Sequence, residues 1–196
     1  HRSWTGYGAQ KDYATQLTHN DWILSLDADE RISPDLADEI QALLAGQPTC
    51  QGYRLPRVTR YLNRWIRTTD WYPDFQLRLY DRRVSSWSRV AVHESVHVSG
   101  QVGQLRNEIH HHAYPDLSSH LATIDRYTTL AANQWFNEGR GTGPINLVLH
   151  PAATFLRNYL LRLGCLQGVP GLVVSLMNTY YVFLKHAKLW EQTKQR

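Results

Sequence analysis

Ile23-Leu24-Ser25-Leu26-Asp27-Ala28-Asp29-Glu30 is the stretch of this 196-residue chain around which the other motifs are arranged. A short apolar run bounded by polar residues is typical of a buried strand, and here the run leads directly into three carboxylates. In open α/β sheets, ligands bind beyond the carboxyl ends of the strands. Residues two apart on an extended backbone point to the same side, so Asp27 and Asp29 are expected to face one ligand.

Two carboxylates placed in this way are suitable ligands for a hard cation such as Mg²⁺ or Mn²⁺, which can in turn hold a diphosphate. The alternative is an acidic turn without a ligand, since so short a motif also arises by chance.

Helical patterns flank this stretch on both sides. The run from Ala9 to Leu17 is helix-like. After the acids, Ser33 is a suitable N-cap and Pro34 suits a first helical turn. Leucine and isoleucine then recur at helical spacing until Gly46, where the helix should end. Strand, carboxylates and helix therefore follow in the order that a metal–diphosphate site needs, and they predict an α/β fold.

The middle of the chain offers further polar groups at strand ends. Phe75 to Tyr80 alternates and predicts a strand. Val90-Ala91-Val92 leads into His93 and Glu94; Glu94 could be a general base, with His93 as its partner or a phosphate contact. The alternative is a strand-end pair with no chemistry.

Basic side chains and histidines are concentrated in two other stretches. One stretch is a basic patch for an anionic acceptor or for donor phosphates, or else a solvated face; it contains Arg54, Arg57, Arg60, Arg64 and Arg67. The other is the run of three histidines from 110 to 112. Adjacent residues on a strand point to alternate faces, so the three histidines cannot all bind one ion, but one of them could be a third metal ligand. The spacing of Cys and His is not that of a zinc site.

The C-terminal segment has a different composition. Gly139 to Gly143 is a glycine-rich linker and marks the predicted domain boundary. From Pro144 to Arg196 the chain has six basic residues and one acidic residue, so this segment is strongly positive although the whole chain is only +4. Two apolar helices with basic and aromatic flanks favour attachment to an anionic membrane surface over nucleic-acid binding. A helical hairpin packed on the protein body is the alternative.

The composition also indicates a compartment. The two cysteines, Cys50 and Cys165, are far apart, which indicates a reducing environment without a disulfide framework. The sequence shows neither a signal peptide nor an apolar run as long as a membrane span. We therefore expect a cytoplasmic protein at the inner face of a bacterial cytoplasmic membrane.

Several of these motifs together resemble the family 2 glycosyltransferases, in particular the branch similar to lipopolysaccharide-core β-glucosyltransferases. The resemblance covers nearly the whole chain, and these are the stretches that carry it: Trp4-x-Gly6-Tyr7-Gly8-Ala9-Gln10-Lys11, Asp21 to Glu30, Pro73 to Leu79, Val92-His93-Glu94, His111-x-x-Tyr114, Phe155-Leu156-x-x-Tyr159 and Gly164-x-x-x-Gly168-x-x-Gly171.

This resemblance implies a GT-A fold, a nucleotide-sugar donor (a UDP-sugar) and a divalent cation, Mn²⁺ or Mg²⁺. It implies single displacement with inversion at the anomeric carbon, onto a glycolipid or polysaccharide acceptor. Carried over residue by residue, the implied metal site consists of Asp29, Asp27 and His111: Asp29 as the direct ligand, Asp27 as a contact to the donor ribose or to a metal-bound water, and His111 as a contact to the metal or the diphosphate. The implied donor contacts are Asp27, Lys11, Arg78 and His93, with Arg78 steadying the leaving group. Glu94 is the implied catalytic base, and Asp74 is its rival.

The resemblance also implies that residues 1–140 are the C-terminal part of a partial GT-A catalytic domain, a Rossmann-like mixed sheet holding the metal and the acceptor. Residues 141–196 are then a helical, membrane-associating hairpin. The family's opening strand and its nucleobase-binding loop are not found in this chain. A different metal-dependent transferase, or a non-catalytic membrane-peripheral binding module, is the alternative function.

Overall fold

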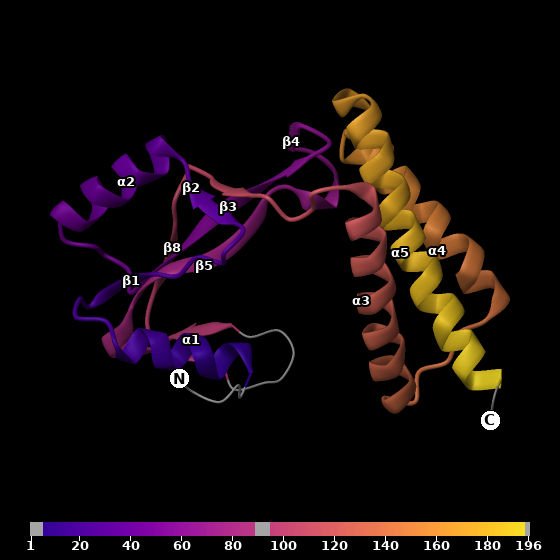
Figure 1. Ribbon diagram of the computed structural model, residues 1–196, viewed down its shortest axis with the longest axis horizontal. Coiled ribbons are helices and arrows are strands. Elements are labelled where there is room, and N and C mark those ends of the chain that lie inside the picture. The colour runs from indigo at the N-terminus through magenta and orange to yellow at the C-terminus, as the bar shows by residue number, and fades with distance from the viewer. Residues whose placement is uncertain (1–5, 89–94, 195–196) are drawn as a thin grey trace. The chain divides into compact units, whose positions relative to one another are not determined.

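The computed structural model describes residues 6–88 and 95–194 (Figure 1). The chain forms two compact units. Residues 1–58 and 74–111 make up the first, called here the sheet unit, and residues 59–73 and 112–196 make up the second, called here the helical unit. Each unit has its own core, and each is described separately below.

The sheet unit is built on a mixed sheet. Its strands lie in the order β1 (Trp22–Leu24), β5 (Asp74–Asp81), β3 (Gly52–Tyr61), β9 (Ile109–His111) and β2 (Glu30–Ile32). The β1–β5, β3–β5 and β2–β9 pairs are antiparallel, whereas β8 (Val102–Gln104) runs parallel to β3. A separate two-stranded ribbon joins β6 (Ser85–Trp87) to β7 (Val96–Val98). The predicted α/β fold with a mixed sheet is confirmed.

The first strand is shorter and less buried than its sequence predicts. β1 ends at Leu24, two residues before the end of the apolar run, and its three residues are half-buried. It lies at one end of the strand order and pairs with β5. A strand with one described neighbour keeps part of its surface exposed, which explains why a purely apolar run is not fully covered here.

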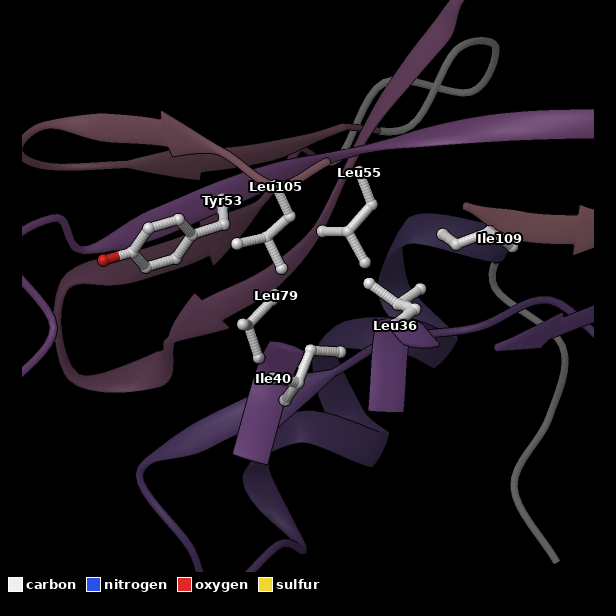
Figure 2. Close-up of a cluster of buried hydrophobic side chains, with 7 residues drawn as sticks. All are labelled: Leu36, Ile40, Tyr53, Leu55, Leu79, Leu105 and Ile109. Carbon is white, nitrogen blue, oxygen red and sulfur yellow. The ribbon is translucent and has the colours of Figure 1, made fainter. Parts of the chain in front are cut away.

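Two helices accompany the sheet, α1 (Tyr7–Gln16) and α2 (Pro34–Ala45). The predicted start of α2 is confirmed, because the Ser33 hydroxyl accepts a hydrogen bond from the Leu36 backbone N–H at 3.1 Å. Gly46 caps its C-terminus. The apolar face of α2 packs into the main core of the sheet unit (Figure 2), whose buried members are Leu36, Ile40, Tyr53, Leu55, Leu79, Leu105 and Ile109.

The helical unit consists chiefly of three long helices, α3 (Leu117–Asn137), α4 (Pro144–Leu156) and α5 (Val169–Lys194). Helix α5 packs against both of the others (Figure 1). The unit also contains β4 (Arg64–Ile66), which pairs with the last three residues of β3, and the short helix η1 (Thr69–Trp71). No helix among the described residues combines the length and the apolar character needed to cross a membrane.

The turn between α4 and α5 accounts for the glycines of the C-terminal motif. A π-helical turn, η3 (Arg157–Leu161), and a 3-10 turn, η4 (Gly164–Gln167), connect the two helices. A Cβ atom at Gly171 would collide with the carbonyl oxygen of Gly164. The two backbones approach so closely that glycine is required at this position.

The predicted linker, Gly139 to Gly143, connects α3 to α4. Both helices belong to the helical unit. Helix α3 precedes the linker in sequence, but it belongs to the same compact unit as the helices that follow the linker. The assignment of separate functions to residues 1–140 and 141–196 stays a prediction.

Candidate functional site

The three acids that follow β1 lie on a closed turn. Ala28 and Asp29 form the turn, and β2 begins at Glu30. The Glu30 backbone N–H donates to the Asp27 carbonyl oxygen at 3.0 Å, and the Asp27 N–H donates to Glu30 Oε2 at 3.1 Å. The sequence predicted an extended backbone from Asp27 to Asp29, and this prediction is wrong. The two reciprocal hydrogen bonds close the backbone into a turn.

Glu30 is the buried acid of this turn. Its side chain is 0% exposed, and its Oε1 accepts hydrogen bonds from Arg57 Nη1 at 2.9 Å and from Arg78 Nη2 at 2.7 Å. A buried carboxylate is tolerated only when it is paired and hydrogen-bonded. Two guanidinium groups and the Asp27 N–H meet that requirement, so Glu30 fixes the shape of the turn.

Asp27 faces cations of the protein itself. Its Oδ1 lies 2.8 Å from Lys11 Nζ, and its Oδ2 accepts a hydrogen bond from Arg78 Nη2 at 2.5 Å. Burial works against ionisation of Asp27, but the hydrogen bond from Lys11 and the charge of Arg78 outweigh it and hold the pKa of this carboxyl below its usual value. Each oxygen of Asp27 therefore already has a cationic partner, and its contact with the donor ribose or with a metal-bound water stays a prediction.

Asp29 and His111 form a second pair on the outer side of the turn. His111 Nε2 lies 3.3 Å from Asp29 Oδ2, and Asp29 remains half exposed. The pairing of β2 with β9, in which Glu30 faces His111, brings these residues together. Burial lowers the pKa of His111, helped by the charge of Arg57 and opposed by that of Asp29. The imidazole is therefore neutral at pH 7, the state in which a histidine can ligate a metal.

Asp29 and His111 are two of the residues predicted to contact a metal ion. Within residues 6–88 and 95–194, no group of three or more Asp, Glu, His or Cys side chains is arranged to hold an ion. Mg²⁺ sites in nucleotide-dependent enzymes, however, often use only one or two protein carboxylates and complete their coordination with substrate phosphates and water. Asp29 supplies one carboxylate of that kind, and a cation held by Asp29 and His111 stays a prediction.

Arg57 connects the buried acid to Asp74. Its Nε and Nη2 donate to Asp74 Oδ2 at 2.9 and 2.6 Å, and Gln76 Nε2 donates to Asp74 Oδ1 at 2.6 Å. Burial opposes the charge of Arg57, but Asp74 and Glu30 raise its pKa above the usual value. Both oxygens of Asp74, the rival catalytic base, are therefore engaged in hydrogen bonds.

Arg78 is the most enclosed cation of the site. It is 7% exposed, and its Nη2 joins Asp27 to Glu30. Its Nε is buried and has no hydrogen-bond partner in the described part of the chain. In this arrangement Arg78 holds the turn together, and its contact with a leaving group stays a prediction.

The structure thus brings together most of the residues predicted for the site and adds two that the sequence reasoning did not single out. The predicted members are Asp27, Asp29, Lys11, Arg78, Asp74 and His111. The additions are Glu30, as the structural acid, and Arg57, which the sequence placed only in a general basic patch. One signal pointed to them: three acids within four residues at a strand end need several cations nearby. Glu94 and His93 lie in residues 89–94, outside the described part of the chain, so their roles stay predictions.

Comparison with known proteins shows what this chain is similar to. It is 28% identical over 192 residues to the lipopolysaccharide core biosynthesis glycosyltransferase LpsC of Rhizobium meliloti, covering 96% of this chain and 71% of that protein. It is 25% identical to uncharacterized glycosyltransferases of Rickettsia felis and Rickettsia bellii, over 97% and 99% of its length. The chain spans 71% and 70% of those two relatives.

No protein-family model matches the chain. The similarity to curated glycosyltransferases extends over almost the whole chain and is shared by several relatives. The chain is therefore a relative of bacterial glycosyltransferases, and the resemblance found in its motifs is confirmed.

Proposed function

We propose that the chain is the metal- and acceptor-binding part of an inverting glycosyltransferase. It would transfer a sugar from a UDP-sugar to a glycolipid or lipopolysaccharide-core acceptor. The observation that carries the proposal is the Asp29–His111 pair, held at a turn that Arg57 and Arg78 stabilise, in a relative of glycosyltransferases.

In this proposal Asp29 and His111 hold a divalent cation, Mn²⁺ or Mg²⁺. The ion would offset the negative charge that develops on the departing nucleoside diphosphate. Glu30 and Arg78 contribute indirectly, because they keep the backbone of the turn in the conformation that presents Asp29 to solvent. Lys11, which pairs with Asp27, provides a positive charge close to the donor phosphates.

We assign the catalytic base to Glu94. The acceptor hydroxyl oxygen forms a bond to the anomeric carbon while the bond from that carbon to the diphosphate oxygen breaks, and Glu94 takes the hydroxyl proton. The hydrogen bonds that Asp74 accepts from Arg57 and Gln76 make it the weaker candidate. The Glu94→Gln variant should keep donor binding and lose transfer by about 10²- to 10⁴-fold, the usual contribution of a general base. Near-normal turnover would shift the base to Asp74.

The metal site is tested by a thermal-shift titration with UDP and Mn²⁺ on the longest reading frame that contains this chain. The wild type should show a Mn²⁺-dependent rise in melting temperature, and Asp29→Asn should not, because the carboxylate acts through the ion. Asp21→Asn, at an exposed acid that pairs with Arg83, is the matched control and should behave like the wild type. If the folded wild type shows no shift, a non-catalytic binding module becomes the better account.

We further propose that the helical unit attaches the protein to the inner face of the cytoplasmic membrane. The turn between α4 and α5 leaves a group of large apolar side chains at least half exposed, namely Leu156, Leu160, Leu161, Leu163, Leu166 and Val169. Arg157 and Arg162 lie among them and are also more than half exposed. Apolar side chains mixed with cations suit the boundary between anionic headgroups and acyl chains.

A further inference from the structure

The helical unit contains a group of basic side chains that does not belong to the acidic turn. The linker supplies Arg140, α4 supplies His150, and α5 supplies Lys185 and His186. These four residues are called the basic cluster here. The ring of Trp135, near the end of α3, contacts three of them, so all three long helices of the unit contribute to this place.

Two cations of the basic cluster lie on the Trp135 ring. Lys185 Nζ is 4.0 Å from the ring centroid, and Arg140 Cζ is 5.3 Å from it. A cation within about 6 Å of a tryptophan ring is attracted by the negative face of the ring. Trp135 therefore keeps two like charges close to each other, and burial together with the charge of Arg140 lowers the pKa of Lys185.

The two histidines of the basic cluster are stacked beside these cations. The rings of His150 and His186 have centroids 5.0 Å apart and planes at 10°, and the His186 ring lies 5.4 Å from that of Trp135. His186 Nδ1 is 2.9 Å from the hydroxyl oxygen of Thr142, which fixes the orientation of this buried ring. His150 is exposed on α4. The stacked pair therefore has one anchored ring and one ring that solvent reaches.

The acids of the described chain do not neutralise the basic cluster. Glu138 pairs with Arg140 at 2.7 Å and also accepts a hydrogen bond from Gln134. Within residues 6–88 and 95–194, no Asp or Glu lies within ion-pair distance of Lys185. A half-buried ammonium group without a carboxylate partner, beside a second cation, is an electrostatic cost that a bound anion would remove.

The donor groups of the basic cluster suit a phosphate better than a metal ion. Two neighbouring histidines can hold a transition metal, but the charges of Lys185 and Arg140 would repel a divalent cation at this place. A phosphate group has several acceptor oxygens. An ammonium group, a guanidinium group and imidazole N–H groups can donate to different oxygens of one phosphate.

We infer that the basic cluster is a binding site for a phosphate group, carried by a soluble phosphate ester or by the headgroup of an anionic lipid. The site is distinct from the apolar turn between α4 and α5. Lys185 follows Val169, the first residue of α5, by 16 positions, which is about 24 Å along a helix. The inference concerns the helical unit alone and does not depend on sugar transfer.

Lys185 and Lys194 provide a matched pair of variants. Both are on α5, and both lie over a tryptophan ring, since Lys194 Nζ is 6.0 Å from the centroid of Trp190. Lys185→Gln removes the ammonium group of the basic cluster, whereas Lys194→Gln removes the same charge elsewhere on the helix. Lys185→Arg keeps the positive charge. Arg140→Gln is a second test of the site at a side chain that is 57% exposed, so it should not disturb folding.

The experiment uses the longest reading frame that contains this chain. The imidazole NMR signals of His150 and His186, assigned with a His150→Gln variant, are followed during a titration with inorganic phosphate against sodium chloride of equal ionic strength. The signals should shift saturably with phosphate and not with chloride. Lys185→Gln and Arg140→Gln should each weaken this binding by roughly 10-fold, the contribution of one charge-assisted hydrogen bond. Lys194→Gln and Lys185→Arg should bind phosphate nearly as the wild type does.

Sedimentation with vesicles distinguishes the two sources of the phosphate group. Vesicles of phosphatidylglycerol are compared with vesicles of phosphatidylcholine, whose headgroup has no net charge. If the ligand is a lipid headgroup, Lys185→Gln should sediment less with phosphatidylglycerol than Lys194→Gln does. If the ligand is a soluble ester, the two variants should sediment equally while phosphate binding still separates them.

Two results would overturn the inference. One is the absence of any saturable phosphate shift in a folded protein whose vesicle binding is also the same for Lys185→Gln and Lys194→Gln. The other is an equal loss of phosphate binding and of vesicle binding in these two variants, because it would assign the effect to the overall charge of the helix instead of the basic cluster. Neither result depends on whether the protein binds UDP and Mn²⁺, so the transferase proposal is tested separately.

Discussion

Replacing Glu30 by glutamine should destabilise the sheet unit by about 3 kcal/mol, although the two side chains have nearly the same shape. The Glu30 carboxylate is completely buried and accepts hydrogen bonds from Arg57, Arg78 and the Asp27 N–H. Removing one partner of a buried ion pair costs about 3–5 kcal/mol, because the remaining charge stays buried without compensation.

The lower end of that range is expected for this variant. Glutamine keeps one acceptor oxygen, and Arg57 and Arg78 keep Asp74 and Asp27 as partners. The amide NH₂ must nevertheless face either the two guanidinium groups or the Asp27 N–H. In both orientations a donor meets a donor, so at least one hydrogen bond of the wild type is lost.

Urea denaturation, followed by circular dichroism and tryptophan fluorescence, measures the change. With a urea dependence of about 1–3 kcal/mol per M, a loss of about 3 kcal/mol lowers the midpoint by roughly 1–3 M. Asp21→Asn removes an acid from an exposed pair with Arg83 and is the control, with an expected cost of about 0–1 kcal/mol. If Glu30→Gln costs no more than Asp21→Asn, the two arginines do not stabilise the turn through Glu30, and our account of the site is refuted.

Three further predictions concern the helical unit. Gly171→Ala should destabilise it by about 1–3 kcal/mol, the usual cost of overpacking, whereas Gly141→Ala, which meets open space, should be nearly neutral in the same urea assay. Lowering the pH from 7 towards 4 should destabilise the unit, because unfolded His120 binds a proton near pH 6.5 and folded His120 only near 4. The melting temperature should therefore fall less steeply with pH in His120→Gln than in the wild type. An equally steep fall in both would assign the pH dependence to other groups. Leu161→Glu should reduce sedimentation with anionic vesicles, since Leu161 is 78% exposed at the turn between α4 and α5. The control is Leu17→Glu, at an exposed leucine of the sheet unit. Equal vesicle binding by the two variants would contradict membrane docking through this turn.

Local sequence determined the elements that depend on neighbouring residues. Ser33 and Pro34 begin α2 and Gly46 ends it, because a side-chain cap, a fixed φ angle and a helix-ending residue all act within one turn. Asp116 likewise caps α3 by accepting a hydrogen bond from the Ser119 N–H at 2.7 Å. The order of strand, acids and helix, and with it the relationship to glycosyltransferases, also follows from the sequence.

Tertiary structure alone decided what each acid of the turn does. Asp27, Asp29 and Glu30 are nearly equivalent in a sequence motif, but Asp27 pairs with Lys11 and Arg78, Asp29 lies beside His111, and Glu30 is buried. The partners come from a helix and from strands as far as 82 positions away in the sequence. They meet because β2 pairs with β9 and β3 pairs with β5.

The aromatic cluster of Trp71, Tyr114 and His120 in the helical unit depends on tertiary structure in the same way. Trp71, Tyr114, His120 and Asn178 come from three separate parts of the chain, and no spacing in the sequence connects them. Local patterns specify where helices and strands begin, since those depend on contacts within a few residues. Partners, burial and pKa depend on which distant residues the fold brings within hydrogen-bonding distance, and for this protein those properties separate the half-exposed Asp29 from the buried, structural Glu30.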